Sequence, residues 1–204
     1  MTDNVEYVKG DAVVFDLESA SMDKRALVFT LSAVRFNKRD REVGVSINNG
    51  KLDTTGANVL HLKLNVTEQI LAGRLIDPDT ISWWNKQPPE AREELICGKN
   101  TSVKEGLILF AAFVRGAQVF CRGTDFDPPI VSTLFADFDV KLPWKYNQPR
   151  DVRTYIDALS GGTDGYLSEW KKGDWFISHH SLHDCIRDAE QMQMAAWVGS
   201  PEKA

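Results

Sequence analysis

Two carboxylates at the end of an apolar run place the strongest constraint on how this chain can fold. The segment 11–20 reads DAVVFDLESA, so Asp16 and Glu18 close a β-branched and aromatic stretch that is typical of a buried strand. Because side chains alternate along a strand, these two carboxylates project from the same face, roughly 7 Å apart. Buried carboxylates stay ionised only beside a positive charge, and a divalent metal ion is the usual one.

The Asp-x-Glu pattern is short, and the chain contains two further copies of it. Residues 40–42 lie in a charged run that is typical of a solvated turn. Residues 188–190 lie in a helical pattern, where side chains two apart do not share a face. Only the first copy combines an apolar strand with same-face geometry. A strand end that simply reaches solvent is the alternative interpretation.

Composition limits the class of protein. A chain of 204 residues with 43% hydrophobic content is expected to form one domain over residues 1–204. No apolar run approaches the roughly 20 residues that cross a bilayer, and the first residues do not resemble a secretory signal. Cys97, Cys121 and Cys185 lack CxxC spacing, which predicts a reducing, cytoplasmic location without a disulfide framework or zinc site.

The net charge of −5 argues against a protein that coats nucleic acid by bulk electrostatics. It does not exclude an enzyme that acts on nucleic acid, because bound divalent ions would reverse the sign of a carboxylate pocket locally.

The order of the expected elements predicts an α/β fold with a mixed central sheet flanked by helices. Strands are expected at 11–17, 26–36, 43–49, 58–65 (an edge strand) and 117–121. Helices are expected from Thr67, with that residue as its cap, from Asp77 with Pro78 in the first turn, and over 89–96, 103–114, 130–136, 150–159 and 183–194.

Two further clusters carry groups suited to chemistry. Asp125 and Asp127 follow an expected strand and precede a helix, and such junctions are where α/β proteins place reactive groups. His179 precedes Asp184 by five positions at the entry to the last expected helix.

These motifs, in this order, resemble the DEDDh family of 3′–5′ exonucleases. The resemblance rests on three motifs: DLE at residues 16–18, FD at 126–127 and H-x4-D at 179–184. The segments DPDTISWW (77–84), FCRGTDFD (120–127) and RDVRT (150–154) resemble the branch with the phage T4-type exodeoxyribonucleases and the mycobacterial 3′–5′ exoribonucleases. Each motif is weak alone, but five in the same order over residues 11–190 are a specific signal.

The resemblance implies a ribonuclease H-like fold and a two-metal site. Asp16, Glu18, Asp127 and Asp184 would bind two Mg²⁺ or Mn²⁺ ions, with Asp16 bridging them, and His179 would be the general base. Oxygen ligands suit these ions, and two ions can activate water and stabilise the leaving oxygen of a phosphodiester.

Several residues compete for these roles. Asp125 competes with Asp127, and the family order Phe-Asp favours Asp127. His180 and His183 compete with His179, and only His179 has the family spacing. Asp188 lies one helical turn beyond the last motif and is expected to be a surface carboxylate. At positions 181 and 185 the family commonly has alanines, whereas this chain has serine and cysteine.

Trp83, Arg122 and Arg150 are the candidate substrate contacts. A tryptophan can stack on a base and an arginine can bind phosphate. The alternatives are packing for Trp83-Trp84, of which at least one should be core, and local ion pairs for the arginines.

The resulting prediction is a metal-dependent 3′–5′ exonuclease that acts on the 3′ end of single-stranded DNA or RNA and releases nucleoside 5′-monophosphates. DNA is slightly favoured because of the phage-like resemblance. The expected location is the cytoplasm, the host's if the chain is phage-encoded. Family members often form homodimers, but no feature here specifies an interface. The alternatives are an exoribonuclease, a catalytically silent nucleic-acid-binding module of the same fold, and a metal-free glycosidase with a carboxylate pair.

Overall fold

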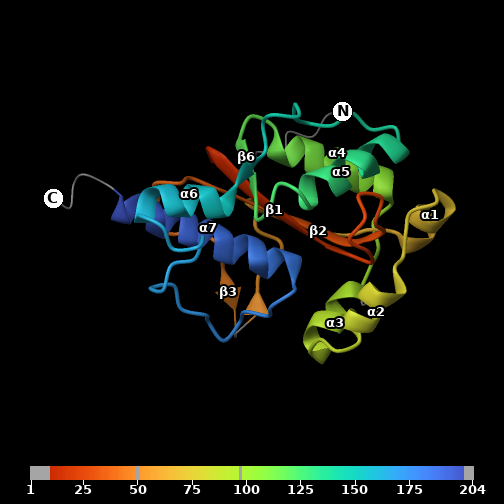
Figure 1. Ribbon diagram of the computed structural model, residues 1–204, viewed down its shortest axis with the longest axis horizontal. Coiled ribbons are helices and arrows are strands. Elements are labelled where there is room, and N and C mark those ends of the chain that lie inside the picture. Colours follow the sequence, from red (N-terminus) through yellow and green to blue (C-terminus); the bar gives the residue numbers. More distant parts are fainter. Residues whose placement is uncertain (1–9, 49–50, 97, 200–204) are drawn as a thin grey trace.

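A five-stranded mixed sheet forms the centre of the protein. The computed structural model describes residues 10–48, 51–96 and 98–199, and its strand order is β5-β2-β1-β6-β7 (Figure 1). The pairs β1–β2 and β2–β5 are antiparallel, whereas β6 and β7 continue the sheet in parallel. The bounds are Ala12–Ser19 for β1, Val28–Phe36 for β2, Val59–Lys63 for β5, Gln118–Cys121 for β6 and Arg150–Asp151 for β7. The predicted mixed sheet and the edge position of β5 are confirmed.

Helices cover both faces of this sheet. On one face lie α4 (Val103–Val114) and α5 (Asp127–Asp137), and on the other lie α6 (Val152–Ser160) and α7 (Ser181–Val198) (Figure 1). Phe15 and Leu17 of β1 pack in the core on the α4 side, whereas Val14 packs with α7. Because the side chains alternate, Asp16 and Glu18 face α7. None of the described helices is long and apolar enough to cross a membrane.

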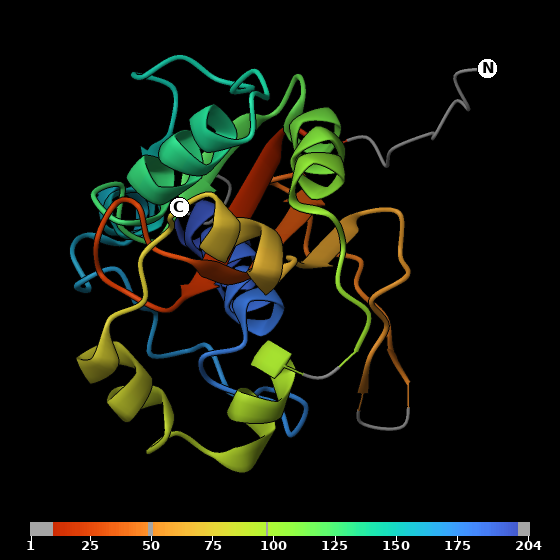
Figure 2. The same cartoon turned by 90° about the vertical axis from the view of Figure 1, so that its right-hand side faces the viewer.

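Three short helices join β5 to α4. They are α1 (Val66–Leu71), α2 (Pro78–Trp84) and α3 (Pro89–Ile96), and the last two extend beyond the sheet on the side where α7 begins (Figure 2). Asp77 caps α2 as predicted, since its carboxylate accepts hydrogen bonds from the backbone N–H of Asp79 and Thr80. The predicted cap of α1 is wrong, because Asn65 rather than Thr67 accepts the hydrogen bond there.

The predicted strand over 43–49 is also wrong. Among its described residues only Ile47–Asn48 form a strand, β3, which pairs with β4 (Lys51–Leu52) in a separate hairpin. Gly44 has a φ of 74°, and the Asn58 side chain donates to the carbonyls of Val43 and Gly44. A side chain therefore satisfies backbone groups that a ladder would otherwise use. Residue 49, the last of the predicted strand, lies outside the described residues, as do residue 50 and Cys97.

Candidate active site

Strand β1 delivers the first two carboxylates to one place. Asp16 pairs with Ser32 and Glu18 with Thr30, and the register shifts between Glu18 and Ser19. Such a bulge bends the strand locally and is common next to active sites. Glu18 is only 9% exposed, so a carboxylate is buried where the strand leaves the sheet.

Two helix starts supply the other carboxylates. Asp184 lies in the first turn of α7, and carboxylate oxygens of Asp16, Glu18 and Asp184 lie within 4.8 Å of one another. Asp127 is the first residue of α5 and is 2% exposed. Its charge acts on both β1 carboxylates, raising their pKa values. The structure thus gathers all four predicted carboxylates from segments that are far apart in the sequence.

Electrostatics show that this group is incomplete without added positive charge. Burial, followed by repulsion from neighbouring carboxylates, raises the pKa of Asp16 and of Glu18 well above their ordinary values. Burial likewise raises the pKa of Asp127 to about 8, and it raises the pKa of Asp184. Divalent cations remove this repulsion, and an all-oxygen donor set suits Mg²⁺ or Mn²⁺. The residues therefore fit the metal site that the resemblance implies.

The prediction that Asp188 is a surface carboxylate is wrong. Asp188 is 2% exposed, and Arg122 Nε donates to both of its oxygens at 3.0 Å. Arg187 Nε donates to Asp188 at 2.8 Å and its Nη1 donates to Asp184. Burial opposes the charge of Arg187, but Asp188 and Asp184 outweigh it and raise the pKa of the guanidinium. Asp188 lies on the side of α7 that faces the sheet, where Arg122 and Arg187 neutralise its charge.

His179 lies beside this carboxylate group. Its backbone N–H donates to Asp184 Oδ2 at 3.2 Å, and its φ of 61° is left-handed, which turns the chain sharply before α7. Its ring meets that of Trp83 edge to face, with the centroids 4.9 Å apart. The structure thus places the predicted base next to Asp184, one of the predicted metal ligands, and leaves the residue partly exposed.

The competing residues lie in other surroundings. Asp125 is exposed, in contrast to the buried Asp127. His183 Nδ1 accepts the backbone N–H of Ile177 at 2.9 Å, and burial followed by the neighbouring His180 lowers the pKa of His183 to about 3. His180 is directed to Glu94 of α3 instead, with 3.4 Å between Nε2 and Oε2. These placements favour Asp127 over Asp125 as a metal ligand, and His179 over His180 and His183 as the base.

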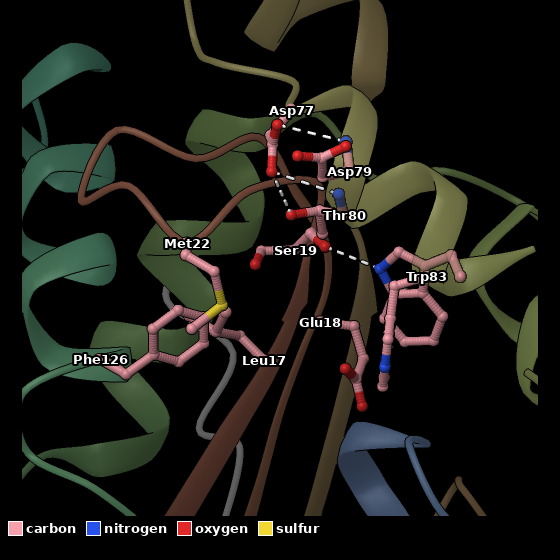
Figure 3. A pocket seen from close by; sticks show the side chains of 10 residues that line it. Leu17, Glu18, Ser19, Met22, Asp77, Asp79, Thr80, Trp83 and Phe126 are labelled. Atoms are coloured by element: carbon pink, nitrogen blue, oxygen red, sulfur yellow. Dashed lines mark hydrogen bonds between the residues drawn. The ribbon is translucent and has the colours of Figure 1, made fainter.

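A cavity of about 430 Å³ opens beside Glu18. In Figure 3 Met22 and Phe126 lie on one side of it and Trp83 on the other, while Glu18 points toward α7. Trp83 is 42% exposed, whereas Trp84 is 5% exposed and donates its Nε1–H to the carbonyl of Ser19 at 2.9 Å. The expectation that at least one of the pair is core is therefore confirmed. The full lining is Leu17, Glu18, Ser19, Met22, Asp77, Asp79, Thr80, Trp83, Trp84 and Phe126.

The two predicted arginine contacts lie elsewhere. Arg122 is held by Asp188 with its side chain 6% exposed, and its guanidinium lies 4.1 Å from the centroid of the Tyr166 ring. Arg150 is exposed and donates to the carbonyls of residues 147–149, and it lines a separate cavity with Gln118 and Trp144. The structure does not bring either guanidinium to the Glu18 cavity.

Sequence reasoning missed Arg187 and the apolar wall of the cavity. Arg187 follows Asp184 by three positions, and this helical spacing alone was a signal that the two side chains share a face. Met22 had no comparable signal, and Phe126 was noted only as the neighbour of Asp127, because the tertiary structure alone brings these two side chains to one cavity.

Fold and site together define a class: a ribonuclease H-like nuclease with carboxylates on the central strand and a histidine before the last helix. The chain belongs to the family described as the 3′–5′ exoribonuclease Rv2179c-like domain, whose model matches residues 11–196. It is 28% identical over 205 residues to the exodeoxyribonuclease of Enterobacteria phage T4, with 89% of this chain and 87% of that protein covered. The predicted class, a 3′–5′ exonuclease, is confirmed.

Solved structures show the same fold at low identity. E. coli exonuclease I in complex with a dT13 oligonucleotide superimposes with a TM-score of 0.53 at 15% identity, covering 96% of this chain but 42% of that one. The Mg²⁺- and Mn²⁺-bound form of S. pombe Pop2p has a TM-score of 0.56 at 10% identity and covers 94% and 86% of the two chains. This chain thus spans less than half of exonuclease I, and these likenesses establish the ribonuclease H-like fold.

Proposed function

We propose that this protein hydrolyses the last phosphodiester bond at the 3′ end of single-stranded nucleic acid and releases a nucleoside 5′-monophosphate. The observation that carries the proposal is that carboxylate oxygens of Asp16, Glu18 and Asp184 lie within 4.8 Å of one another. The backbone N–H of His179 is hydrogen-bonded to Asp184 beside them. The nucleic-acid complex of exonuclease I and the metal-bound form of Pop2p support it by analogy.

In this proposal Asp16, Glu18, Asp127 and Asp184 hold two Mg²⁺ or Mn²⁺ ions. When bound, such ions lower the pKa of a water and stabilise the charge that develops on the phosphate oxygens. The protein's part is to fix the donors: β1 presents two carboxylates, and the first turns of α5 and α7 present one each. Arg187 donates to Asp184, so this guanidinium would have to give up that oxygen if an ion took its place.

His179 is the proposed general base. Imidazoles are the side chains that most often move protons near neutral pH. The hydrogen bond from the His179 backbone to Asp184 fixes the residue beside the carboxylates and does not use a ring nitrogen. Trp83, in edge-to-face contact, limits the rotation of this ring.

The cavity beside Glu18 is the proposed site of the terminal nucleotide. Its volume of about 430 Å³ lies in the usual range for small-ligand pockets. Trp83 offers an exposed ring on one side, and Met22 with Phe126 offers an apolar surface on the other (Figure 3). A base between these surfaces would be held through its π face, which every base has.

We propose DNA rather than RNA as the preferred substrate. The phage T4 relative is an exodeoxyribonuclease and matches over most of both chains, which supports this choice. The family description names an exoribonuclease, which is the specific observation in favour of RNA.

The test is digestion of matched 5′-labelled single-stranded DNA and RNA with Mg²⁺, Mn²⁺ or EDTA, resolved at single-nucleotide resolution. A metal-dependent ladder that shortens from the 3′ end is expected, faster on DNA. Faster shortening of RNA would select the exoribonuclease. Binding without shortening of either strand, by folded protein in every metal, would favour the silent binding module.

The proposal treats residues 1–204 as one domain that works in the cytoplasm. Apolar clusters on both faces of a single sheet support the first point. Cys121 and Cys185 are buried and unpaired among the described residues, which suits a reducing compartment.

A further inference from the structure

A second group of potential ligands lies at the edge of the sheet and shares no residue with the carboxylate group of the candidate active site. It consists of His61 on β5, Glu94 on α3 and His180 just before α7, and one ligand atom from each lies within 4.8 Å of the others. His61 Nε2 is 2.6 Å from Glu94 Oε1, and His180 Nε2 is 3.4 Å from Glu94 Oε2.

The ring of His61 is held in one orientation. Ser32 Oγ is 2.7 Å from His61 Nδ1, so Nε2 is the nitrogen that faces Glu94. Ser32 is itself fixed by a buried hydroxyl chain, 2.7 Å from Ser181 Oγ, which is 2.8 Å from Thr30 Oγ1. A hydrogen-bonded second nitrogen is the usual support of a metal-binding histidine.

His180 faces Glu94 with Nε2, the nitrogen that an ion bound there would use. The residue is 8% exposed, and its Nδ1 has no hydrogen-bond partner among the described residues. Its ring is stacked on that of His183 with the centroids 3.8 Å apart, which fixes its plane. Buried polar groups are normally paired, and the 3.4 Å separation from Glu94 is long for a hydrogen bond.

We propose that His61, Glu94 and His180 form a binding site for a transition-metal ion, with Zn²⁺ as the best-suited ion. Two imidazoles and one carboxylate form a known zinc donor set that leaves a position for water. Nitrogen donors disfavour Mg²⁺, so this site and the all-oxygen carboxylate site select different ions.

A neighbouring ammonium group indicates how the site is balanced without the ion. Lys63 Nζ lies 3.3 Å from Glu94 Oε1, and both side chains are 16% exposed. A bound Zn²⁺ would compete with this ammonium for Glu94, and the partial exposure of Glu94 would give the ion a route of entry. The bound ion would join β5, α3 and the start of α7.

The test uses full-length protein that is stripped with EDTA, given Zn²⁺ in a large excess of Mg²⁺, desalted and analysed for zinc by mass spectrometry. Wild type and the exposed-residue control Glu93→Gln should retain one zinc per chain. Glu94→Gln and His180→Gln should lose it. Asp16→Asn, which alters the carboxylate site, should retain it, so that the result is independent of the proposed nuclease function.

Circular dichroism of each variant confirms folding, and Co²⁺ substitution gives a second readout. Visible absorption bands of a nitrogen-ligated Co²⁺ are expected in wild type and Glu93→Gln and should be absent in Glu94→Gln. Three results would overturn the proposal: no zinc in folded wild type, equal zinc in Glu94→Gln, or loss of all zinc in Asp16→Asn. The first would leave the group as an ion-pair cluster only.

Discussion

At the scale of single residues, Asp16 and His179 reach the site through different backbone conformations. Asp16 sits in a regular strand, so asparagine can replace it with the same shape. His179 has a φ of 61°, in the region where most side chains are strained but asparagine is tolerated. Asparagine is therefore the substitution that least disturbs the backbone at both positions.

We expect Asp16→Asn and His179→Asn each to lower the rate of the cleavage step by about 10²–10⁴-fold, the range for loss of a group that acts on the proton or charge in the transition state. The measurement is the single-turnover rate of 3′ shortening with Mn²⁺. His179→Asn should still bind Mn²⁺, because the carboxylates are intact. Normal turnover by Asp16→Asn would refute the mechanism.

At the scale of elements, α2 carries two adjacent tryptophans, of which one is proposed to bind substrate and the other packs in the core. Trp83 is exposed in the cavity and Trp84 is buried under Ser19. Trp83→Ala should raise KM by roughly 5- to 150-fold, since stacking is worth about 1–3 kcal/mol per base, and it should leave the unfolding free energy nearly unchanged. Trp84→Ala should lower that free energy by about 3–5 kcal/mol.

Steady-state kinetics and denaturant unfolding measured on both variants check this prediction. Trp83→Phe is the matched control, because it retains an aromatic face and should retain most of the affinity. If Trp83→Ala left KM unchanged, the cavity would not be the nucleotide site.

Most elements could be predicted because their signals are local. Val103–Val114 has a helical apolar period, and Asp77-Pro78 is a cap followed by a first-turn proline. The start of α5 at Asp127, earlier than predicted, follows from the tolerance of prolines in a first turn. The segment 43–49 could not be predicted, because a distant asparagine side chain satisfies its backbone.

Only the residues of the candidate site that belong to sequence motifs could be predicted. The four carboxylates and His179 belong to short patterns, and strand alternation placed Asp16 and Glu18 on one face. The burial of Asp188 depends on Arg122, which comes from a loop 66 positions away. No local pattern reports such a pair, which explains the wrong assignment of Asp188 to the surface.

At the scale of the whole molecule, the carboxylate group makes stability depend on pH and metal. The pKa of Asp127 rises from 3.8 to about 8 on folding, so the folded state binds more protons between these values. The unfolding free energy of the metal-free protein should therefore fall as pH rises from about 4 to about 8. Mg²⁺ or Mn²⁺ should restore stability more at pH 8 than at pH 5.

Thermal unfolding in EDTA measures this effect. Asp127→Asn should stabilise the metal-free protein at pH 8 by at least about 1 kcal/mol, or roughly 2–4 °C in Tm. Asp125→Asn, at an exposed position two residues earlier, should change Tm little. A metal-free Tm that stays flat from pH 5 to pH 8 would contradict the raised pKa of Asp127.

The position of α7 in the chain has a consequence for biosynthesis. Asp16 and Glu18 belong to β1, whereas His179 and Asp184 follow only after all the described elements between β1 and α7. A ribosome-bound chain therefore carries its first two carboxylates long before the last one and the histidine can join them. On the proposed mechanism, activity therefore begins only when α7 docks on the sheet, so the docking of this helix is the folding step that switches the enzyme on.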